Sequence, residues 1–579
     1  MFIIYNSFAI AVTHRRREVG ILRALGATRS QVQRLFLVES AIAGLIGSIL
    51  GAAAGLAGAR SIVQYTSAVM ELAGGVAQRV TELSVSPALL IFGIAIGVST
   101  SLLAAWVPAR NAARLDPVQA LQKGKHQVLS IGEHRRRELF AAALSIFCLI
   151  CLLFPDSQFL FYSGYTSMIL AGLLLAPTLT FLLSKWLRPV LRGVFAAEGA
   201  LAADSLVQAP RRTWATVGAL MLSLSMVVNF GGFTSAFYVS VNDWVDDVLN
   251  SDFFVSASAN LTTRTMTFPS EVGSIIEKVQ GVKRVELVRN ARVLFRQTPV
   301  MVIATDIEKV AEQSRRSPIA GNPADMYRLT AAGKGTIVSG TFATINKLGP
   351  GDAVDIPTPS GILRLPIVGI VRDYTDLQGS LFIDRSVYNA WRKDTTSNMA
   401  RVYIDKDQDS ARVRQRIVDA LAGRQRLLVL TNREVRGWIL NLLDQWFALS
   451  YSQIFVATLV AVLGIVNTLT VSITDRRREL GVLQAIGGLR NQVRRTLWIE
   501  AVSIAAIGLV VGIGVGAVNL HYSLDMLKRD LGGIELDYVF PASIVLATIP
   551  VILAAGFVAA LGPAESAVRT KLTEALEYE

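Results

Sequence analysis

Two passages of the chain carry three consecutive arginines, then a glutamate and, two residues later, a glycine. They are Arg15, Arg16, Arg17, Glu18 and Gly20, and Arg476, Arg477, Arg478, Glu479 and Gly481. Clustered guanidinium groups bind anionic lipid headgroups or carboxylates on a partner protein. The arginines alone favour anchoring to lipid, whereas a glutamate at the same place in both passages favours docking of a partner.

Groups that catalyse reactions or hold metals are few. The two cysteines, Cys148 and Cys151, have CxxC spacing but lie inside one apolar run without a second pair, so we expect packing residues. No GxxxxGK[ST], HExxH or GxSxG motif occurs in the sequence. We therefore predict no catalytic, cofactor or metal site and no phosphate loop for ATP in this chain.

An enzyme hypothesis remains for residues 240–446, where Asp352, Asp373 and Asp376 are candidate acids. That region contains no histidine or cysteine to act with them. Asp352 belongs to a GPGD passage, in which an aspartate is expected for the turn itself. This hypothesis therefore ranks last.

The composition indicates a membrane protein. Only 17% of the residues are charged, against about 25% in soluble proteins, and the mean hydropathy is +0.45. The net charge of +13 comes from residues beside apolar runs, which favours a membrane surface over nucleic acid. Nine apolar runs are expected, the first too short to span a bilayer: 1–13, 33–58, 87–107, 139–155, 162–185, 214–239, 447–473, 492–519 and 541–562.

The loops between these runs alternate in charge. One set is rich in arginine and lysine and includes both triplets, whereas the loop at 155–161 has neither residue. Excess positive charge stays on the cytoplasmic side of a membrane. The triplets are therefore predicted to face the cytoplasm and residues 240–446 to face outward.

The two arginine passages are copies of one sequence. Residues 15–39 and 476–500 align without a gap at an offset of 461, and thirteen of the twenty-five positions are identical. Apolar residues at helical spacing predict a short interfacial helix in each copy, ended by Gly26 and by Gly487. A short helix that joins two spans can act as a lever for a partner that grips it.

The next span is predicted to begin just after this helix. Thr28 and Gln31 have the spacing of a capping box, whereas the second copy has Leu489 in place of the threonine. Glu39 and Glu500 match between the copies, and two readings stay open for them. They are functional acids within the membrane, or inner-leaflet acids paired with an arginine such as Arg34 or Arg495.

Glycines extend the repeat along the following span. Their spacing of four residues puts them on one helix face, where small residues let another helix approach closely. The predicted packing residues are Gly47, Gly51 and Gly55 in the first copy and Gly508, Gly512 and Gly516 in the second. The copies end alike at 108–121 and 563–576, where each proline is expected to begin a short amphipathic helix.

Each repeat thus consists of a span, a basic turn, a second span, an outer loop, a third span and a cytoplasmic helix. The run 447–473 opens the second repeat, and its counterpart 1–13 is too short. We expect the first repeat to lack the start of its opening span, through truncation or a late start.

The RRREVGILRALGA turn followed by a glycine-rich span resembles the FtsX-like permease family of ABC transporters, which includes MacB-like efflux pumps and lipoprotein-releasing complexes. The likeness covers both repeats and, more weakly, VSGTFATINKLGPGDAVDI in the region 240–446. It implies that both basic turns, from Arg15 to Gly26 and from Arg476 to Gly487, are coupling helices received by a cytoplasmic ABC ATPase. It also implies a multi-pass protein of the bacterial cytoplasmic (inner) membrane.

The predicted fold is a multi-span α-helical membrane protein with one α+β extracytoplasmic domain and two FtsX-like helical repeats. Strand and helix signals are expected at 282–288, 336–338, 341–348, 362–371, 401–404, 410–422 and 427–430. The predicted divisions are a first repeat at 1–125, a two-span linker at 126–213, a span at 214–239, a MacB-like domain at 240–446 and a second repeat at 447–579.

Two functions are compatible with these features of the sequence. The favoured one is a permease subunit that couples ATP hydrolysis by a separate ATPase to motion of the extracytoplasmic domain, for export or extraction of a lipid, lipoprotein, peptide or drug. The alternative is a regulatory scaffold that activates an outer partner such as a cell-wall hydrolase without transport. Expected partners are the ATPase, membrane lipid and an extracytoplasmic adaptor or substrate-carrier protein, and no nucleic acid.

Overall fold

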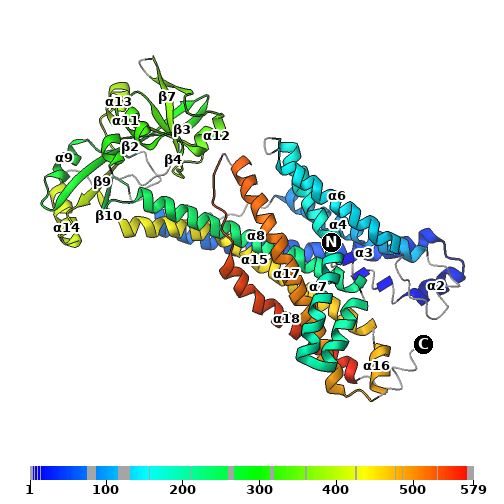
Figure 1. The fold of residues 1–579 in the computed structure, drawn as a ribbon. Helices are drawn as coiled ribbons and strands as arrows, with labels where there is room; N and C mark the ends of the chain where they lie inside the picture. Colours follow the sequence, from blue (N-terminus) through cyan, green and yellow to red (C-terminus); the bar gives the residue numbers. More distant parts are fainter. Residues whose placement is uncertain are drawn as a thin grey trace.

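The chain forms a long helical body with a sheet-rich domain at one end (Figure 1). In this computed structural model the described residues are 4–5, 7–8, 11–12, 15–74, 86–114, 131–154, 157–208, 210–258, 266–312, 318–358, 361–423, 427–475, 477–485, 487–530 and 533–569. Arg476, most of the predicted run 1–13, and the predicted repeat ends beyond residues 114 and 569 lie outside them.

Within the described residues, seven helical stretches are long and apolar enough to cross a membrane. They are Arg29–Ser61, Pro87–Ala113, Gln158–Val207, Thr216–Val248, Asn432–Val466, Arg490–Asp530 and Ala542–Glu565. Seven of the nine predicted runs fall within or overlap these stretches. The run 139–155 lies largely in α6 (Ile131–Leu152), which packs on α7 (Gln158–Gln208) and is not among the seven.

Two of these helices form a stalk that reaches far beyond the predicted apolar runs. They are α8 (Pro210–Val248) and α15 (Asn432–Asp475), which pack side by side (Figure 1). At 1.5 Å per residue each is roughly 60 Å long, about twice the hydrocarbon thickness of a bilayer. Outside lipid a helix needs only one apolar face, so the hydropathy signal ends before the helix does.

The sheet domain is defined here as residues 253–431, between the two stalk helices. Its elements are β1 (Phe253–Ser256), α9 (Glu271–Glu277), β2 (Val282–Phe295), β3 (Thr298–Thr305), α10 (Ile307–Ala311), β4 (Pro318–Ala320), α11 (Pro323–Ala331), β5 (Thr336–Ser339), α12 (Gly340–Asn346), β6 (Ala353–Thr358), β7 (Gly361–Val371), β8 (Ser380–Asp384), α13 (Arg385–Arg392), β9 (Met399–Ile404), α14 (Ser410–Leu421) and β10 (Leu428–Thr431). Every strand and helix signal predicted for this region coincides with one of them, which confirms the α+β class.

One mixed sheet runs through this domain. The strand order is β10-β1-β9-β2-β3-β8-β5-β7-β4, with β6 paired to β7. The pairs β3–β8 and β5–β7 are parallel, and the other pairs are antiparallel. Because β1 and β10 are neighbours, the domain enters from α8 and returns to α15 at one edge of the sheet, directly above the stalk.

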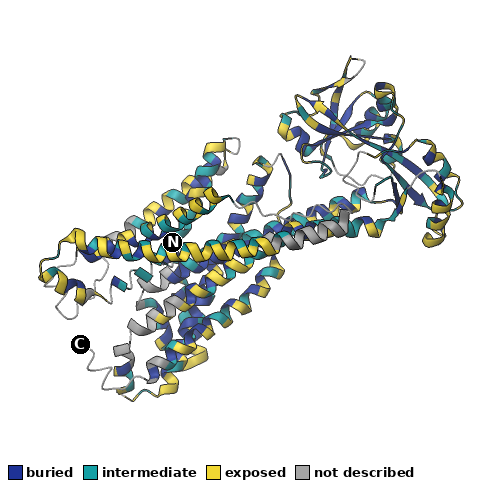
Figure 2. Ribbon diagram, turned by 180° about the vertical axis from the view of Figure 1, so that it is seen from behind, coloured by how far each residue is buried: buried dark blue, intermediate teal, exposed yellow. Residues whose placement is uncertain are grey.

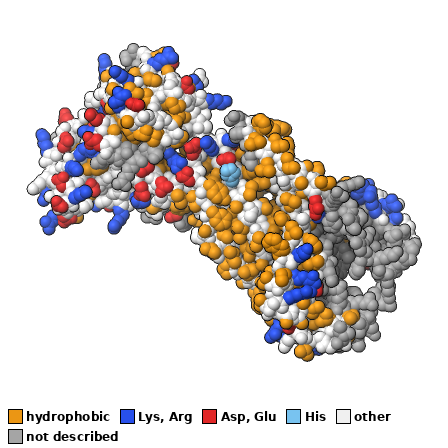
Figure 3. Space-filling view, viewed as in Figure 1, with side chains coloured by type: hydrophobic (Ala, Val, Ile, Leu, Met, Phe, Trp, Pro, Cys, Tyr) orange, Lys and Arg blue, Asp and Glu red, His pale blue; other side chains and the backbone are white. Residues whose placement is uncertain are grey.

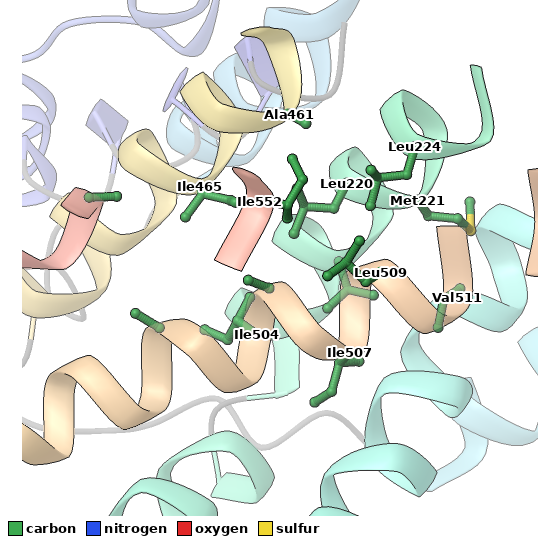
Figure 4. Close-up of a cluster of buried hydrophobic side chains, with 14 of the residues drawn as sticks. Leu220, Met221, Leu224, Ala461, Ile465, Ile504, Ile507, Leu509, Val511 and Ile552 are labelled. Atoms are coloured by element: carbon green, nitrogen blue, oxygen red, sulfur yellow. The ribbon is translucent and has the colours of Figure 1, made fainter. Parts of the chain in front are cut away.

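The remaining helices of the second repeat pack on the stalk. They are α16 (Arg477–Ala485), α17 (Arg490–Asp530) and α18 (Ala542–Arg569). Figure 4 shows the buried centre, where side chains of α8, α15, α17 and α18 meet: Leu220, Met221, Leu224, Ala461, Ile465, Ile504, Leu509 and Ile552. This cluster is the structural centre of the membrane-spanning part.

The first repeat forms a separate pair of helices. α3 (Arg29–Gly74) packs mainly on α4 (Pro87–Ala113), and much of its described surface is exposed (Figure 2). The contact is close where Ser40 Oγ lies 3.0 Å from Ser101 Oγ, and both side chains are buried. Small residues therefore let these two helices approach, as in other membrane helix pairs.

One prediction about the repeat ends is wrong. Pro108 and Pro563 do not begin new helices, because α4 and α18 continue through them. Proline removes one backbone hydrogen bond inside a helix, which is tolerated where water or neighbouring helices satisfy the freed carbonyl. Each third span and the described residues that follow its proline are therefore one helix.

Candidate functional site

The first basic turn is a short helix closed by a glycine. α2 (Arg16–Ala24) ends at Leu25, and Gly26 follows with φ +98°. The Gly26 amide donates to the Arg23 carbonyl at 3.2 Å, and the Ala27 amide to the Leu22 carbonyl at 3.0 Å. This is a Schellman-type end, in which a residue with positive φ turns the chain out of the helix.

The second basic turn repeats this geometry. α16 is followed by Gly487 with φ +103°, whose amide donates to the Gln484 carbonyl at 3.1 Å. The Gly488 amide donates to the Leu483 carbonyl at 2.9 Å. Two copies of one sequence thus form the same helix and the same exit, with glycine at the position where a side chain would be strained.

The starts of the two spans that follow the basic turns, α3 and α17, differ from each other by one hydrogen bond. The Thr28 amide donates to Gln31 Oε1 at 2.8 Å, and the Gln31 amide donates back to Thr28 Oγ1 at 3.3 Å, which is the predicted capping box. In the second copy the Leu489 amide donates to Gln492 Oε1 at 3.0 Å, but leucine has no oxygen for the return bond. Half of the box is retained.

In each repeat, four buried residues at equivalent positions pack the second span against the third span next to the basic turn. In the first repeat Val32, Phe36, Ala109 and Ala113 are buried together, and in the second repeat Val493, Leu497, Ala564 and Val568. The members of each set come from the second and third spans of their repeat. Val19 of α2 and Leu483 of α16 pack on these clusters, so a force on either turn acts on two spans at once.

The charged residues of the turns occupy one end of the helical body. Arg15 pairs with Glu39 at 2.9 Å, with both side chains about half exposed, so the partner seen for Glu39 is Arg15 and not Arg34 or Arg495. Glu500, its repeat counterpart, is 97% buried and does have an interaction partner. Glu18 is exposed in the first turn of α2, where the helix dipole favours a negative charge.

The other predicted coupling residues can be located by their positions along α2 and α16. Arg16 and Arg17 open α2, and Arg477, Arg478 and Glu479 open α16. Gly20 and Gly481 are buried at equivalent positions inside the two short helices. Both helices lie at the end of the body opposite the sheet domain (Figure 1).

The six predicted packing glycines fall into two groups. A Cβ atom on Gly508, Gly512 or Gly516 would lie 2.6 Å from the side chain of Leu220, Leu224 or Val228, so side chains of α8 pack directly on the backbone of α17 along this face. Gly47, Gly51 and Gly55 meet no other described residue within 4 Å. On α3 a close contact is made instead at Gly44, where an added Cβ would lie 2.7 Å from Ser101.

The far end of α17 is tied to the sheet domain. Residues 533–541, called here the α17–α18 loop, lie against the segment that follows β7. Arg372 donates through both terminal nitrogens to Asp537, at 2.7 and 3.2 Å, and the Tyr374 hydroxyl donates to the Glu535 carbonyl at 2.6 Å. Burial raises the pKa of Tyr374 to about 12, so this hydroxyl stays a donor.

Backbone contact tightens the same joint. Gly533 has φ +80°, and a Cβ there would lie 2.4 Å from Thr344 of α12. This joint was missed in the sequence, because Arg372 and Asp537 are 165 residues apart and neither belongs to a motif.

The three acids of the enzyme hypothesis have structural roles. Asp352 accepts from the Gly349 amide at 2.8 Å, as expected for its turn. Asp373 accepts from Trp244 Nε1 at 3.1 Å, and Asp376 pairs with Arg292 at 2.9 Å. Among the described residues no group of three histidine, cysteine or acidic side chains is arranged to hold a metal ion.

The cysteines are free and buried, as predicted for packing residues. Cys148 lies in a cluster with Phe161 and Tyr522, its Sγ 3.0 Å from the tyrosine hydroxyl. This contact joins α6 to α17.

The fold and the paired turns define a polytopic membrane protein with a duplicated helical unit. Residues 1–117 and 451–572 match the family model described as FtsX-like permease C-terminal. An uncharacterized ABC transporter permease protein of Mycobacterium tuberculosis is 27% identical in sequence. That alignment covers all of this chain and 68% of the Mycobacterium protein. The macrolide export ATP-binding/permease protein MacB of Escherichia coli is 37% identical over 120 residues. This aligned stretch covers 21% of this chain and 17% of MacB.

Two solved structures are similar in part. The periplasmic region of MacB from Actinobacillus actinomycetemcomitans aligns at 10% identity and TM-score 0.26, covering 34% of this chain and 96% of that one. The extracellular domain of the ABC-type transporter YknZ from Gram-positive bacteria aligns at 14% identity and TM-score 0.23, covering 31% and 99%. By sequence the chain is thus similar to ABC transporter permeases of the FtsX/MacB type, and its seven candidate spans indicate a multi-pass protein of the bacterial inner membrane.

Proposed function

We propose that the chain is the permease subunit of an ABC transporter that converts ATP hydrolysis by a separate cytoplasmic ATPase into motion of the sheet domain. The ATPase would grip the two basic turns, α2 and α16. The sheet domain would move a substrate outside the membrane, and lipid, lipoprotein, peptide and drug all fit this role.

The observation that carries the proposal is the path along α17. This helix of 41 residues begins at the α16 turn and ends at the loop that Arg372 and Tyr374 hold. Between these ends its glycine face lies directly on α8, which itself leads into the sheet domain. A tilt of the turn would therefore reach the sheet domain through α17 and through the stalk.

The experiment is capture of the tagged full chain from membranes in mild detergent. We expect a soluble protein with a GxxxxGK[ST] phosphate loop to accompany it and to hydrolyse ATP. Leu25→Asp combined with Leu489→Asp should release this protein, because both leucines are exposed at the ends of the turns, at 81% and 65%. Val418→Asp on α14, in the sheet domain, is the matched control and should retain it.

Two results would overturn the proposal. One is a complex that contains no ATPase under conditions that preserve the membrane assembly. The other is an ATPase that stays bound equally well to the variant with both turns altered.

A further inference from the structure

A cavity of about 340 Å³ lies where the sheet domain meets the outer part of the stalk. Its walls come from α8 and α15, its roof from the sheet, and one side from the α17–α18 loop through Ile534. The volume is at the lower end of the range for small-molecule sites, about 300–1,000 Å³. The cavity thus has room for one slender group.

The lining is aromatic and aliphatic. Trp244 projects from α8, Trp438 and Leu442 from α15, and Phe382 and Met399 from the sheet domain. Apolar walls of this kind favour hydrocarbon over water, because transfer of hydrocarbon out of water is favourable in proportion to the area buried.

The carboxylates on the wall are already satisfied by the protein. Asp373 accepts from Trp244 Nε1 at 3.1 Å and from the Thr375 hydroxyl at 2.7 Å. Asp376 accepts from Arg292 at 2.9 Å and from the Gln378 amide at 2.9 Å. Because neither acid depends on a ligand for its hydrogen bonds, an apolar occupant leaves no carboxylate unpaired.

The cavity opens beside an exposed aromatic residue of α15. Trp446 lines the cavity and is itself 59% exposed, and further along the same helix Tyr451 and Phe455 are 48% and 69% exposed on other faces. Tryptophan and tyrosine concentrate at the membrane–water boundary. Figure 3 shows the change from the charged surface of the sheet domain to the hydrophobic surface of the helices. The cavity therefore lies next to the outer ends of the apolar runs, within reach of the outer leaflet.

We propose that this cavity binds the hydrocarbon chain of a single-chain amphiphile drawn from the outer leaflet. The inference deepens the proposed function and rests on it for the role of the amphiphile as substrate. Tyr374 lines the cavity and donates to the α17–α18 loop, and Ile534 of that loop lines the cavity as well. Movement of α17 would thus change the cavity that holds the chain.

The experiment uses palmitate that carries a photoreactive diazirine near its methyl end. The full chain is placed in lipid nanodiscs without any ATPase, irradiated, and digested for mass spectrometry. We expect saturable labelling of peptides from 237–249 and 438–446, reduced by an excess of unlabelled palmitate. Leu442→Trp should lower this labelling at least about tenfold, because the larger ring fills the cavity.

Leu459→Trp is the matched control on the same helix. Leu459 is 46% exposed and does not line the cavity, so the substitution should leave the labelling unchanged. A diacyl phosphatidylcholine with the same diazirine should label the lipid-facing surface but not these peptides.

Three outcomes would overturn the inference: labelling that never saturates, equal labelling of the two tryptophan variants, or equal labelling of the cavity by the diacyl lipid. Since no ATPase is present, failure here leaves the coupling proposal standing. Conversely, saturable labelling with no ATPase in the captured complex would keep the site and reject the transport role.

Discussion

Arg372 and Asp537 join the sheet domain to the loop between α17 and α18 by two parallel hydrogen bonds of 2.7 and 3.2 Å. Hydrogen bonding to Asp537 also raises the pKa of Arg372 above its usual value, so this guanidinium stays charged at all physiological pH values. The pair is half exposed, and such pairs contribute about 0–1 kcal/mol to stability. Its importance is its position at the far end of α17.

Breaking this pair should uncouple the protein without unfolding it. We expect Asp537→Ala to change the unfolding free energy by less than about 1 kcal/mol and to reduce ATP-driven movement of the sheet domain severalfold. The movement is measured as a distance change between spin labels on the sheet domain and on α17. The control is Asp325→Ala, which breaks a pair of similar length, 2.8 Å, within α11. Equal movement in both variants would show that the joint transmits nothing.

The glycine faces of α17 and α3 should respond differently to the same substitution. In Gly512→Ala the new Cβ would lie 2.6 Å from Leu224, so we expect a loss of about 1–3 kcal/mol from overpacking. Gly51→Ala, at the equivalent repeat position, meets nothing described within 4 Å and should be neutral. The midpoint of unfolding in an SDS titration measures both. A loss of the same size at Gly51 would mean that this face is also packed.

The missing half of the second capping box can be supplied. Leu489→Thr should add the return bond to the Gln492 amide and stabilise the start of α17 by about 1 kcal/mol. Thr28→Val should remove the bond to the Gln31 amide, at a similar cost. Hydrogen exchange should therefore slow about fivefold at residue 492 in one variant and quicken at residue 31 in the other. No change at either amide would contradict the capping assignment.

Alkaline pH should destabilise the sheet domain through Tyr403. Burial, and next the charge of Glu286, raise its pKa to about 12, whereas the unfolded side chain ionises near 10. Below pH 10 both states keep the proton, so its contribution is fully present. Between pH 10 and 12 only the folded state keeps it, so stability falls as pH rises.

Thermal unfolding of the sheet domain followed by circular dichroism measures this slope. Tyr403→Phe should flatten it, at a cost of about 1 kcal/mol for the hydrogen bond from the hydroxyl to Asn250. An unchanged slope in the variant would assign the alkaline loss to other groups.

Local features of the turns were predictable from the sequence because they depend on neighbouring residues. Gly26, Gly487 and the box formed by Thr28 and Gln31 each act within a few positions of the chain. Some strands of the sheet domain were predictable for the same reason, since alternation and turn residues are local signals, whereas β1, β3, β4 and β8 were not predicted.

Features that depend on distant partners were not predictable. Gly51 and Gly512 occupy equivalent positions, yet only Gly512 has a described helix against it. Glu39 pairs with Arg15 across the turn rather than with an arginine on its own helix. The cavity and the joint at Arg372 arise from segments far apart in sequence, so no local sequence pattern predicts them.

Coupling to a cytoplasmic ATPase requires that both basic turns face the cytoplasm. The most direct measurement is labelling of single cysteines with a maleimide that cannot cross membranes, since the native cysteines are buried. We predict that Leu25→Cys and Leu489→Cys are labelled in inverted vesicles and protected in intact cells, and that Asp407→Cys in the sheet domain shows the reverse. Labelling of either leucine position from outside the cell would show that this turn faces outward and that a cytoplasmic ATPase cannot grip it.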